Sequence, residues 1–378
     1  MPVVQVEPFT IAIPDDVLED LAARLRATRW PQASPAAPWE QGTDLAYLRD
    51  LAAYWADGFD WRARERELNE HDHFRATIAG TRVHFIHARA PSGDGIPLIL
   101  THGWPSSFVE LLALVPLLCE EFDLVIPSLP GYGFSERPPH AGIHARHTAR
   151  LWHRLMRGLG YERYGAHGGD WGAGVSTFMA LDDPEPIIGV HLANVDNDPY
   201  TGEGARPLTD AERDYQAHWQ RWLAEEHAYS EIQSTKPQTL AFGLNDSPAG
   251  LAAWIVEKWR AWGDTGGDVE SRFPRDLLLT NVTLYWITAT IGTSILDYYD
   301  DRWSPETSFG PGDFVGVPTA ITGFTHNYVH EGVMPREWAE RLYDVRRFTP
   351  MPRGGHFPAV EEPDLLADDI RAFFGELT

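Results

Sequence analysis

The chain has 378 residues, of which 43% are hydrophobic and 15 are tryptophan, so it carries ample apolar side chain for a large globular core. Its formal net charge of −24 excludes the basic surface that nucleic acids or anionic lipids require. We therefore expect a soluble, cytoplasmic protein that binds neither nucleic acid nor membranes. A homodimer is compatible with the sequence.

The single cysteine, Cys119, excludes an internal disulfide and any zinc site built from cysteines. His140, His144 and His147 lie close together, but no carboxylate spacing beside them supports a metal site, so we expect no metal. The N-terminal residues show no basic segment followed by an apolar run, and no stretch reaches the ~18 apolar residues of a membrane span. We predict neither a signal peptide nor a transmembrane helix.

Residues 1–91 are predicted to form an N-terminal segment. Apolar residues recur at helical spacing after Pro14, and again over residues 45–54. Residues 74–78 and 83–87 alternate in polarity on either side of an Ala-Gly pair, which predicts a β-hairpin.

From residue 92 to 198 short apolar runs alternate with a helical pattern. The predicted strands lie at 97–100, 123–126, 164–167 and 187–192, and the helix lies within 144–159. This alternation predicts the α/β class, with a mostly parallel sheet flanked by helices on both faces.

The alternation stops at about residue 198. Residues 199–311 are rich in helical patterns and aromatic side chains, and we expect them to form a helical cap. Strand-like runs return at 317–324 and 344–348, and a final helix follows Pro363, so residues 312–378 are predicted to complete the core. The organisation is a core interrupted by a helical insertion.

The sharpest local motif is Gly-Gly-Asp-Trp-Gly at residues 168–172, between a predicted strand and a helical stretch. A nucleophile elbow requires small residues two positions before and after the nucleophile, because the turn is tight and strained. Asp170 occupies the nucleophile position of such an elbow. The alternative is a glycine-rich turn whose aspartate only caps the next helix.

His-Gly-Trp-Pro at residues 102–105 follows the strand at 97–100 directly. In α/β-hydrolases the loop at this place supplies one backbone N–H of the oxyanion hole, and the residue after the nucleophile supplies the other. This assigns the two donors to Trp104 and Trp171. His356, after the last strand and before the terminal helix, completes the chain order expected of the α/β-hydrolase fold.

Aspartate at the elbow indicates a different chemistry from that of serine. A carboxylate can displace a leaving group at a saturated carbon and form an alkyl ester of the enzyme. Water activated by His356 can then attack the carbonyl carbon of Asp170, while the oxyanion hole stabilises the tetrahedral charge. Serine would form a stable ether instead. The elbow therefore predicts either the opening of an epoxide or the expulsion of a halide.

Seven longer motifs extend over nearly the whole chain. They lie at residues 28–31, 58–62, 102–105, 127–135, 233–237, 244–248 and 353–357. With these motifs the sequence resembles the microsomal-type epoxide hydrolases, in the bacterial soluble branch that carries the epoxide-hydrolase N-terminal domain. The resemblance implies an α/β-hydrolase fold with a helical cap, and the conversion of an epoxide into a vicinal diol without metal or organic cofactor.

The resemblance also implies two cap tyrosines that hold and protonate the epoxide oxygen. Their flanking motifs assign these roles to Tyr229 and Tyr298, with Tyr299 as the alternative to Tyr298. A phenol with a pKa near ~10 stays protonated at neutral pH and can donate to the leaving oxygen.

One position departs from the family pattern. In the family, a glutamate after the strand that ends near Phe324 orients the histidine. Aligning Phe324 and the motif at residues 335–338 with the family pattern places Asn327 at that position. Asparagine can hold an imidazole through its carbonyl, but it brings no charge. Glu331 is our predicted substitute, and Asp196, after an earlier core strand, is the alternative.

Two other functions are compatible with the sequence. A haloalkane-type dehalogenase would share Asp170 and His356, and would bind halide through the indoles of Trp104 and Trp171. A non-catalytic ligand-binding protein on the same fold is the second alternative, and Asn327 is the residue that favours it. For the epoxide hydrolase, the aromatic cap suggests a small-molecule epoxide that is apolar or aromatic.

Overall fold

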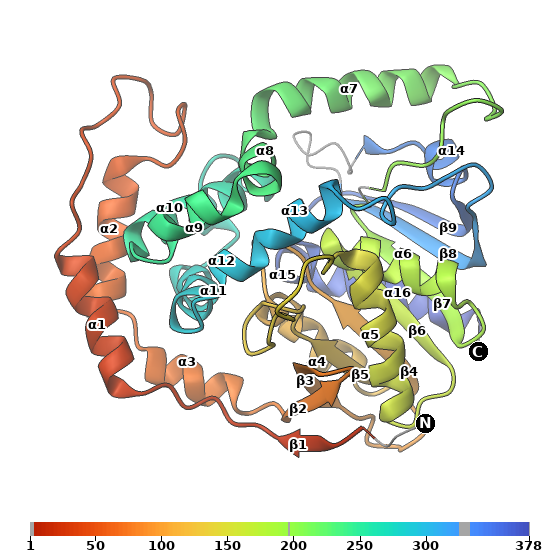
Figure 1. Cartoon of the computed structure of the whole chain (residues 1–378), viewed down its shortest axis with the longest axis horizontal. Helices are drawn as coiled ribbons and strands as arrows, with labels where there is room; N and C mark the ends of the chain where they lie inside the picture. The colour runs from red at the N-terminus through yellow and green to blue at the C-terminus, as the bar shows by residue number, and fades with distance from the viewer. Residues whose placement is uncertain (1–3, 196, 325–332, 378) are drawn as a thin grey trace.

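The apolar runs predicted as strands lie side by side in one sheet, shown in Figure 1. The computed structural model describes residues 4–195, 197–324 and 333–377, and within them the sheet has nine strands in the order β1-β2-β3-β5-β4-β6-β7-β8-β9. The strands are β1 (Val6–Pro8), β2 (His73–Ile78), β3 (Thr81–Ala88), β4 (Ile96–Thr101), β5 (Phe122–Pro127), β6 (Tyr164–Gly169), β7 (Ile187–Ala193), β8 (Val315–Phe324) and β9 (Tyr343–Met351).

The sheet is parallel from β5 to β9, and β1, β2 and β3 add an antiparallel edge. The predicted hairpin therefore forms, and it extends the core sheet, since β3 pairs with β5 through Phe85↔Pro127 and Ile86↔Ile126. The short strand β1 was not predicted. The predicted α/β class with a mostly parallel sheet is confirmed.

Both faces of the central strands are buried. On β4, Ile99 packs in one hydrophobic cluster, while Leu98 and Leu100 pack in a second cluster on the other face. Because parallel strands are covered by helices on both sides, their sequences read as continuous apolar runs. One face carries α5 (Ala145–Gly158) and α6 (Trp171–Asp182), and the other carries η1 (Phe108–Leu114), α4 (Val115–Leu118) and α16 (Pro363–Gly375).

The segment between β7 and β8 folds as the helical cap. Its helices are α7 (Asp210–Glu226), α8 (Ala228–Thr235), α9 (Pro237–Leu244), α10 (Pro248–Trp262), η2 (Val269–Ser271), α11 (Arg275–Ile287), α12 (Ile291–Ser294) and α13 (Leu296–Arg302). Two short helices, α14 (Arg336–Ala339) and α15 (Pro358–Glu361), lie in the last part of the core. Among the described residues, no helix is both long and apolar enough to cross a membrane.

The N-terminal helices α1 (Asp15–Arg26), α2 (Leu45–Asp57) and α3 (Trp61–Leu68) lie between β1 and β2 in the chain, and α1 and α2 lie beside the cap helix α10 (Figure 1). The indole of Trp55 on α2 donates to the hydroxyl of Thr283 on α11, 2.9 Å away and buried. The predicted N-terminal helices α1 and α2 therefore brace the cap from the side away from the sheet.

A buried ion cluster joins the cap to the core. Arg137, in the loop after β5, contacts Asp297 at 2.5 Å and Asp300 at 2.7 Å, and all three side chains are at most 10% exposed. Burial raises the pKa of Asp297 to about 6, although Arg137 opposes the rise. Both aspartates belong to α13, so this cluster fixes the position of that helix over the sheet.

Replacing Arg137 by methionine should lower the free energy of unfolding by about 3–5 kcal/mol, because two buried carboxylates lose their counter-charge. Chemical denaturation measures this loss. The matched control is Arg150→Met, whose partner Glu306 lies 2.8 Å away with both side chains about half exposed. This variant should lose less than about 1 kcal/mol. Equal losses in the two variants would contradict the structural role of the cluster.

Candidate active site

Asp170 lies at a sharp turn between β6 and α6, as the elbow motif predicts. Its backbone has φ 53° and ψ −128°, a conformation that costs a non-glycine residue of order 1–3 kcal/mol. The flanking glycines make the turn sterically feasible. A Cβ on Gly168 would lie 2.1 Å from the carbonyl oxygen of Gly172, and a Cβ on Gly172 would lie 2.0 Å from the carbonyl oxygen of Thr101. The motif is therefore more than a helix cap, because the turn packs directly against the end of β4.

The two oxygens of the Asp170 carboxylate have different surroundings. Oδ1 accepts the backbone N–H of Trp104 at 2.8 Å and that of Trp171 at 2.6 Å, the two donors expected from the sequence. Oδ2 lies 3.4 Å from Nε2 of His356. Gly103 lets the loop approach so closely, since a Cβ there would lie 2.3 Å from Oδ1.

His356 is held in place by the cap and by its own loop. Its backbone N–H donates to the carbonyl oxygen of Trp262 at 2.9 Å, and the two rings meet at 4.9 Å between centroids. The Glu361 carboxylate accepts the N–H groups of Gly355, at 3.1 Å, and Phe357, at 3.0 Å, which flank the histidine. These bonds fix the loop and leave the His356 side chain 8% exposed beside Asp170.

The two predicted cap tyrosines come together above the elbow. The ring of Tyr229, on α8, stacks on Trp104 with centroids 5.3 Å apart and an angle of 6° between planes. Tyr298, on α13, meets Tyr229 edge to face at 5.8 Å and Trp171 at 5.0 Å. Tyr299, the alternative from the sequence, is 41% exposed, whereas Tyr298 is 9% exposed. Tyr298 is thus the residue of this pair that faces Asp170.

Burial raises the pKa of Tyr298 well above its ordinary value near ~10, and the nearby Tyr229 and Asp170 act in the same direction. Its hydroxyl is therefore protonated at neutral pH. A protonated phenol beside a carboxylate can donate to an oxygen that gains negative charge.

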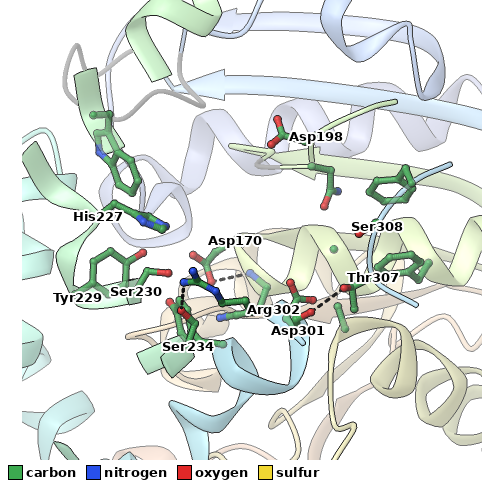
Figure 2. Close-up of a pocket in the computed structure, with 18 residues that line it drawn as sticks. Asp170, Asp198, His227, Tyr229, Ser230, Ser234, Asp301, Arg302, Thr307 and Ser308 are labelled. Atoms are coloured by element: carbon green, nitrogen blue, oxygen red, sulfur yellow. Dashed lines mark hydrogen bonds between the residues drawn. The ribbon is translucent and has the colours of Figure 1, made fainter. Parts of the chain in front are cut away.

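A pocket of about 540 Å³ opens above the elbow. Figure 2 shows Asp170 in this pocket, with Tyr229 and His227 on one side and Asp198 and Ser308 on the other. Aromatic rings line the part near the tyrosines, while Asp301 lines the part near Ser308. Both parts of the pocket combine aromatic and polar side chains, since Phe309 follows Ser308 and Ser230 lies beside Tyr229.

Known proteins match this chain over nearly its whole length. The family model described as "Epoxide hydrolase N terminus" matches residues 6–111, and the model described as "alpha/beta hydrolase fold" matches residues 96–265. A relative from Stigmatella aurantiaca, also assigned as an epoxide hydrolase, is 39% identical over 98% of this chain and 85% of its own length. Epoxide hydrolase 1 from Sus scrofa is 35% identical over 98% of this chain and 89% of its own length.

The chain belongs to the epoxide hydrolase family. The crystal structure of juvenile hormone epoxide hydrolase from the silkworm Bombyx mori superposes with a TM-score of 0.85 at 32% identity, and covers 99% of this chain and 94% of that one. The α/β-hydrolase fold predicted from the sequence is thereby confirmed.

Asn327, at the position where the family has its acid, and the two candidates for that acid, Glu331 and Asp196, lie outside the described residues. Of the three histidines considered for a metal, His144 caps α5 and accepts the N–H of His147 at 3.3 Å. Among the described residues, no group of three or more His, Cys, Asp or Glu side chains is arranged to hold a metal ion.

Sequence reasoning missed two residues that hold His356, namely Trp262 and Glu361. Trp262 acts through its backbone carbonyl, which no sequence pattern identifies. Glu361 lies five positions after the histidine, at the end of the short helix α15, which was not predicted, and an acidic residue there gives no distinctive signal.

Replacing Gly103 by alanine should reduce epoxide hydrolysis at least about 100-fold, because the new methyl group displaces the Asp170 carboxylate from its donors. Steady-state kinetics with an aryl epoxide measure the loss. Gly243→Ala is the control, since a Cβ at that helical position meets no atom within 4 Å. A Gly103→Ala enzyme as active as this control would refute the tight packing of the elbow.

Proposed function

We propose that this epoxide hydrolase opens its substrate through a covalent ester on Asp170. The observation that carries the proposal is the asymmetry of the carboxylate, in which Oδ1 accepts two backbone N–H groups while Oδ2 lies beside His356. Oδ2 attacks an epoxide carbon, the C–O bond of the ring breaks, and the oxygen takes a proton from Tyr229 or Tyr298. The product of this step is an alkyl ester and a tyrosinate.

Water then hydrolyses the ester. His356 takes a proton from water as the water oxygen attacks the Asp170 carbonyl carbon, and the negative charge develops on Oδ1. The Trp104 and Trp171 N–H groups are already in place to stabilise that charge. The tetrahedral intermediate releases the diol oxygen, which takes the proton from His356. The carboxylic acid left on Asp170 returns its proton to the tyrosinate, so the enzyme ends in its starting state.

We also propose that Glu331 orients His356 and stabilises its charged form, in place of Asn327. A carboxylate supports imidazolium electrostatically, whereas an amide only orients the ring. For the substrate, the rings of Trp171, Tyr229 and Tyr298 favour an epoxide with an apolar or aromatic group next to the reacting carbon.

The test of the nucleophile is a single-turnover reaction with styrene oxide, quenched and followed by intact-protein mass spectrometry. The wild-type protein should gain the mass of one epoxide, and Asp170→Asn should gain none, because an amide is a poor nucleophile. The absence of both adduct and diol over a panel of epoxides would instead favour a binding protein that has kept the fold.

The tyrosines distinguish epoxide opening from dehalogenation. Tyr298→Phe should slow epoxide opening about 10²–10⁴-fold, the usual worth of general acid catalysis, and Tyr229→Phe should slow it in the same direction. Tyr299→Phe is the control, since its side chain is exposed. Halide release from haloalkanes that survives in both buried-tyrosine variants would favour the dehalogenase.

The proposed role of Glu331 is tested by the rate of ester hydrolysis, the second half-reaction. Glu331→Gln should slow ester hydrolysis at least about 10-fold and let the ester accumulate, because the imidazolium loses more than 1.4 kcal/mol of stabilisation. Asn327→Ala should leave the rate of this step nearly unchanged. The opposite ranking of the two variants would move the role to Asn327, and wild-type rates in both would direct attention to Asp196.

A further inference from the structure

A second, much smaller cavity of about 20 Å³ touches both Asp170 and His356. This volume is sufficient for a single water molecule, which needs roughly 10–15 Å³ and two to four polar partners. Part of the remaining wall is apolar, from Leu111, Ala193 and Phe357 among others. The cavity is separate from the 540 Å³ pocket in which the epoxide would bind, and both cavities include Asp170 in their walls.

The side chains around this cavity differ in how many of their polar atoms are already used. His102 is fully committed, since its Nδ1 bonds the Gly103 carbonyl at 3.0 Å and its Nε2 accepts the Leu129 N–H at 3.2 Å. Burial lowers the pKa of His102 to about 4, so this ring is neutral. It therefore has no nitrogen left for a water molecule.

His167, three residues before Asp170, belongs to a buried chain of hydrogen bonds. Its Nδ1 lies 3.0 Å from Nδ1 of His191, whose Nε2 lies 3.1 Å from the carboxylate of Asp369. Asp369 resists protonation, because hydrogen bonds from His191, Arg347 and Thr322 outweigh its burial and lower its pKa. The Nδ1 atom of His167 is therefore already used within this chain of hydrogen bonds.

Glu110 contributes the charged group of this cavity. It projects from η1, the helix that follows the Trp104 loop, and lines the cavity together with Ser106. Burial raises the pKa of Glu110 to about 7, while a hydrogen bond from Ser106 and the nearby His356 oppose the rise. Among the described residues Glu110 forms no ion pair, so Ser106 alone does not compensate an ionised carboxylate at this place, and a further polar partner in the cavity would stabilise it.

We propose that this cavity holds the water molecule that hydrolyses the Asp170 ester, and that Glu110 is the residue that positions it. The inference rests on the proposed function. The water donates one hydrogen to His356, which takes it as the oxygen attacks the Asp170 carbonyl carbon. It donates the other hydrogen to the Glu110 carboxylate, which keeps the water oriented and does not itself take the proton. The epoxide-opening step uses no water and is independent of Glu110.

The experiment measures the two half-reactions separately in Glu110→Gln, by rapid quench with styrene oxide and mass spectrometry of the intact protein. Ester formation should stay within 2-fold of the wild-type rate, whereas ester hydrolysis should slow 10-fold to 100-fold, so that the ester accumulates. Glutamine keeps the volume of the side chain and removes its charge, so the midpoint of thermal unfolding should not fall. Glu120→Gln, at an exposed position on the same segment, should match the wild-type protein in both steps.

An unchanged rate of ester hydrolysis in Glu110→Gln would overturn the role of Glu110 and leave the proposed function intact. Equal slowing of both half-reactions, with a lower unfolding midpoint, would also overturn it, because that result identifies Glu110 as a structural residue. The absence of any ester in the wild-type protein would overturn the proposed function, and the inference with it.

Discussion

One carboxylate oxygen, Oδ1 of Asp170, accepts two backbone N–H groups, and the arrangement of the site depends on this pair of hydrogen bonds. The bonds require a backbone turn with positive φ at Asp170 and a glycine at 103, because any side chain there would collide with the carboxylate. They also break the symmetry of the carboxylate, so that only Oδ2 faces His356. In the proposed mechanism charge develops on Oδ1, and donors that are already in place there need no reorganisation, which is how preorganised groups contribute most to a rate.

The sheet supplies the carboxylate and the histidine, whereas the cap supplies the groups around them. The Trp262 carbonyl accepts the backbone N–H of His356, and the Tyr229 ring lies flat on Trp104, whose N–H binds Asp170. Arg137 joins the helix that carries Tyr298 to the core through two buried carboxylates. A shift of the cap would therefore disturb the histidine, a tyrosine and a backbone donor to Asp170 together. This mutual dependence explains why charged groups are buried where cap and core meet.

The parts of the site that were predicted from the sequence are those in which local sterics restrict the residue type. At the glycines around Asp170 and at position 103 the backbone approaches other atoms closely. Such positions admit only glycine, so they can be recognised in the sequence. The partner of the predicted hairpin was not evident, because pairing of β3 with β5 is a long-range contact. The sequence did not distinguish Tyr298 from Tyr299, because the two adjacent residues share the same flanking motif. Packing in the folded protein buries Tyr298 and leaves Tyr299 exposed. Glu110 and Glu361 were not predicted as site residues, because a glutamate outside any motif is expected to be a solvated side chain.

The fate of the water oxygen tests the covalent ester most directly. The reaction is run in water enriched in oxygen-18, with enzyme in molar excess over styrene oxide, so that each molecule turns over at most once. A covalent ester predicts that the label enters the carboxylate of Asp170, found by mass spectrometry of the peptide that contains it, and that the diol is unlabelled. Label in the diol with an unlabelled Asp170 would mean that water attacks the epoxide directly, and would contradict the covalent ester.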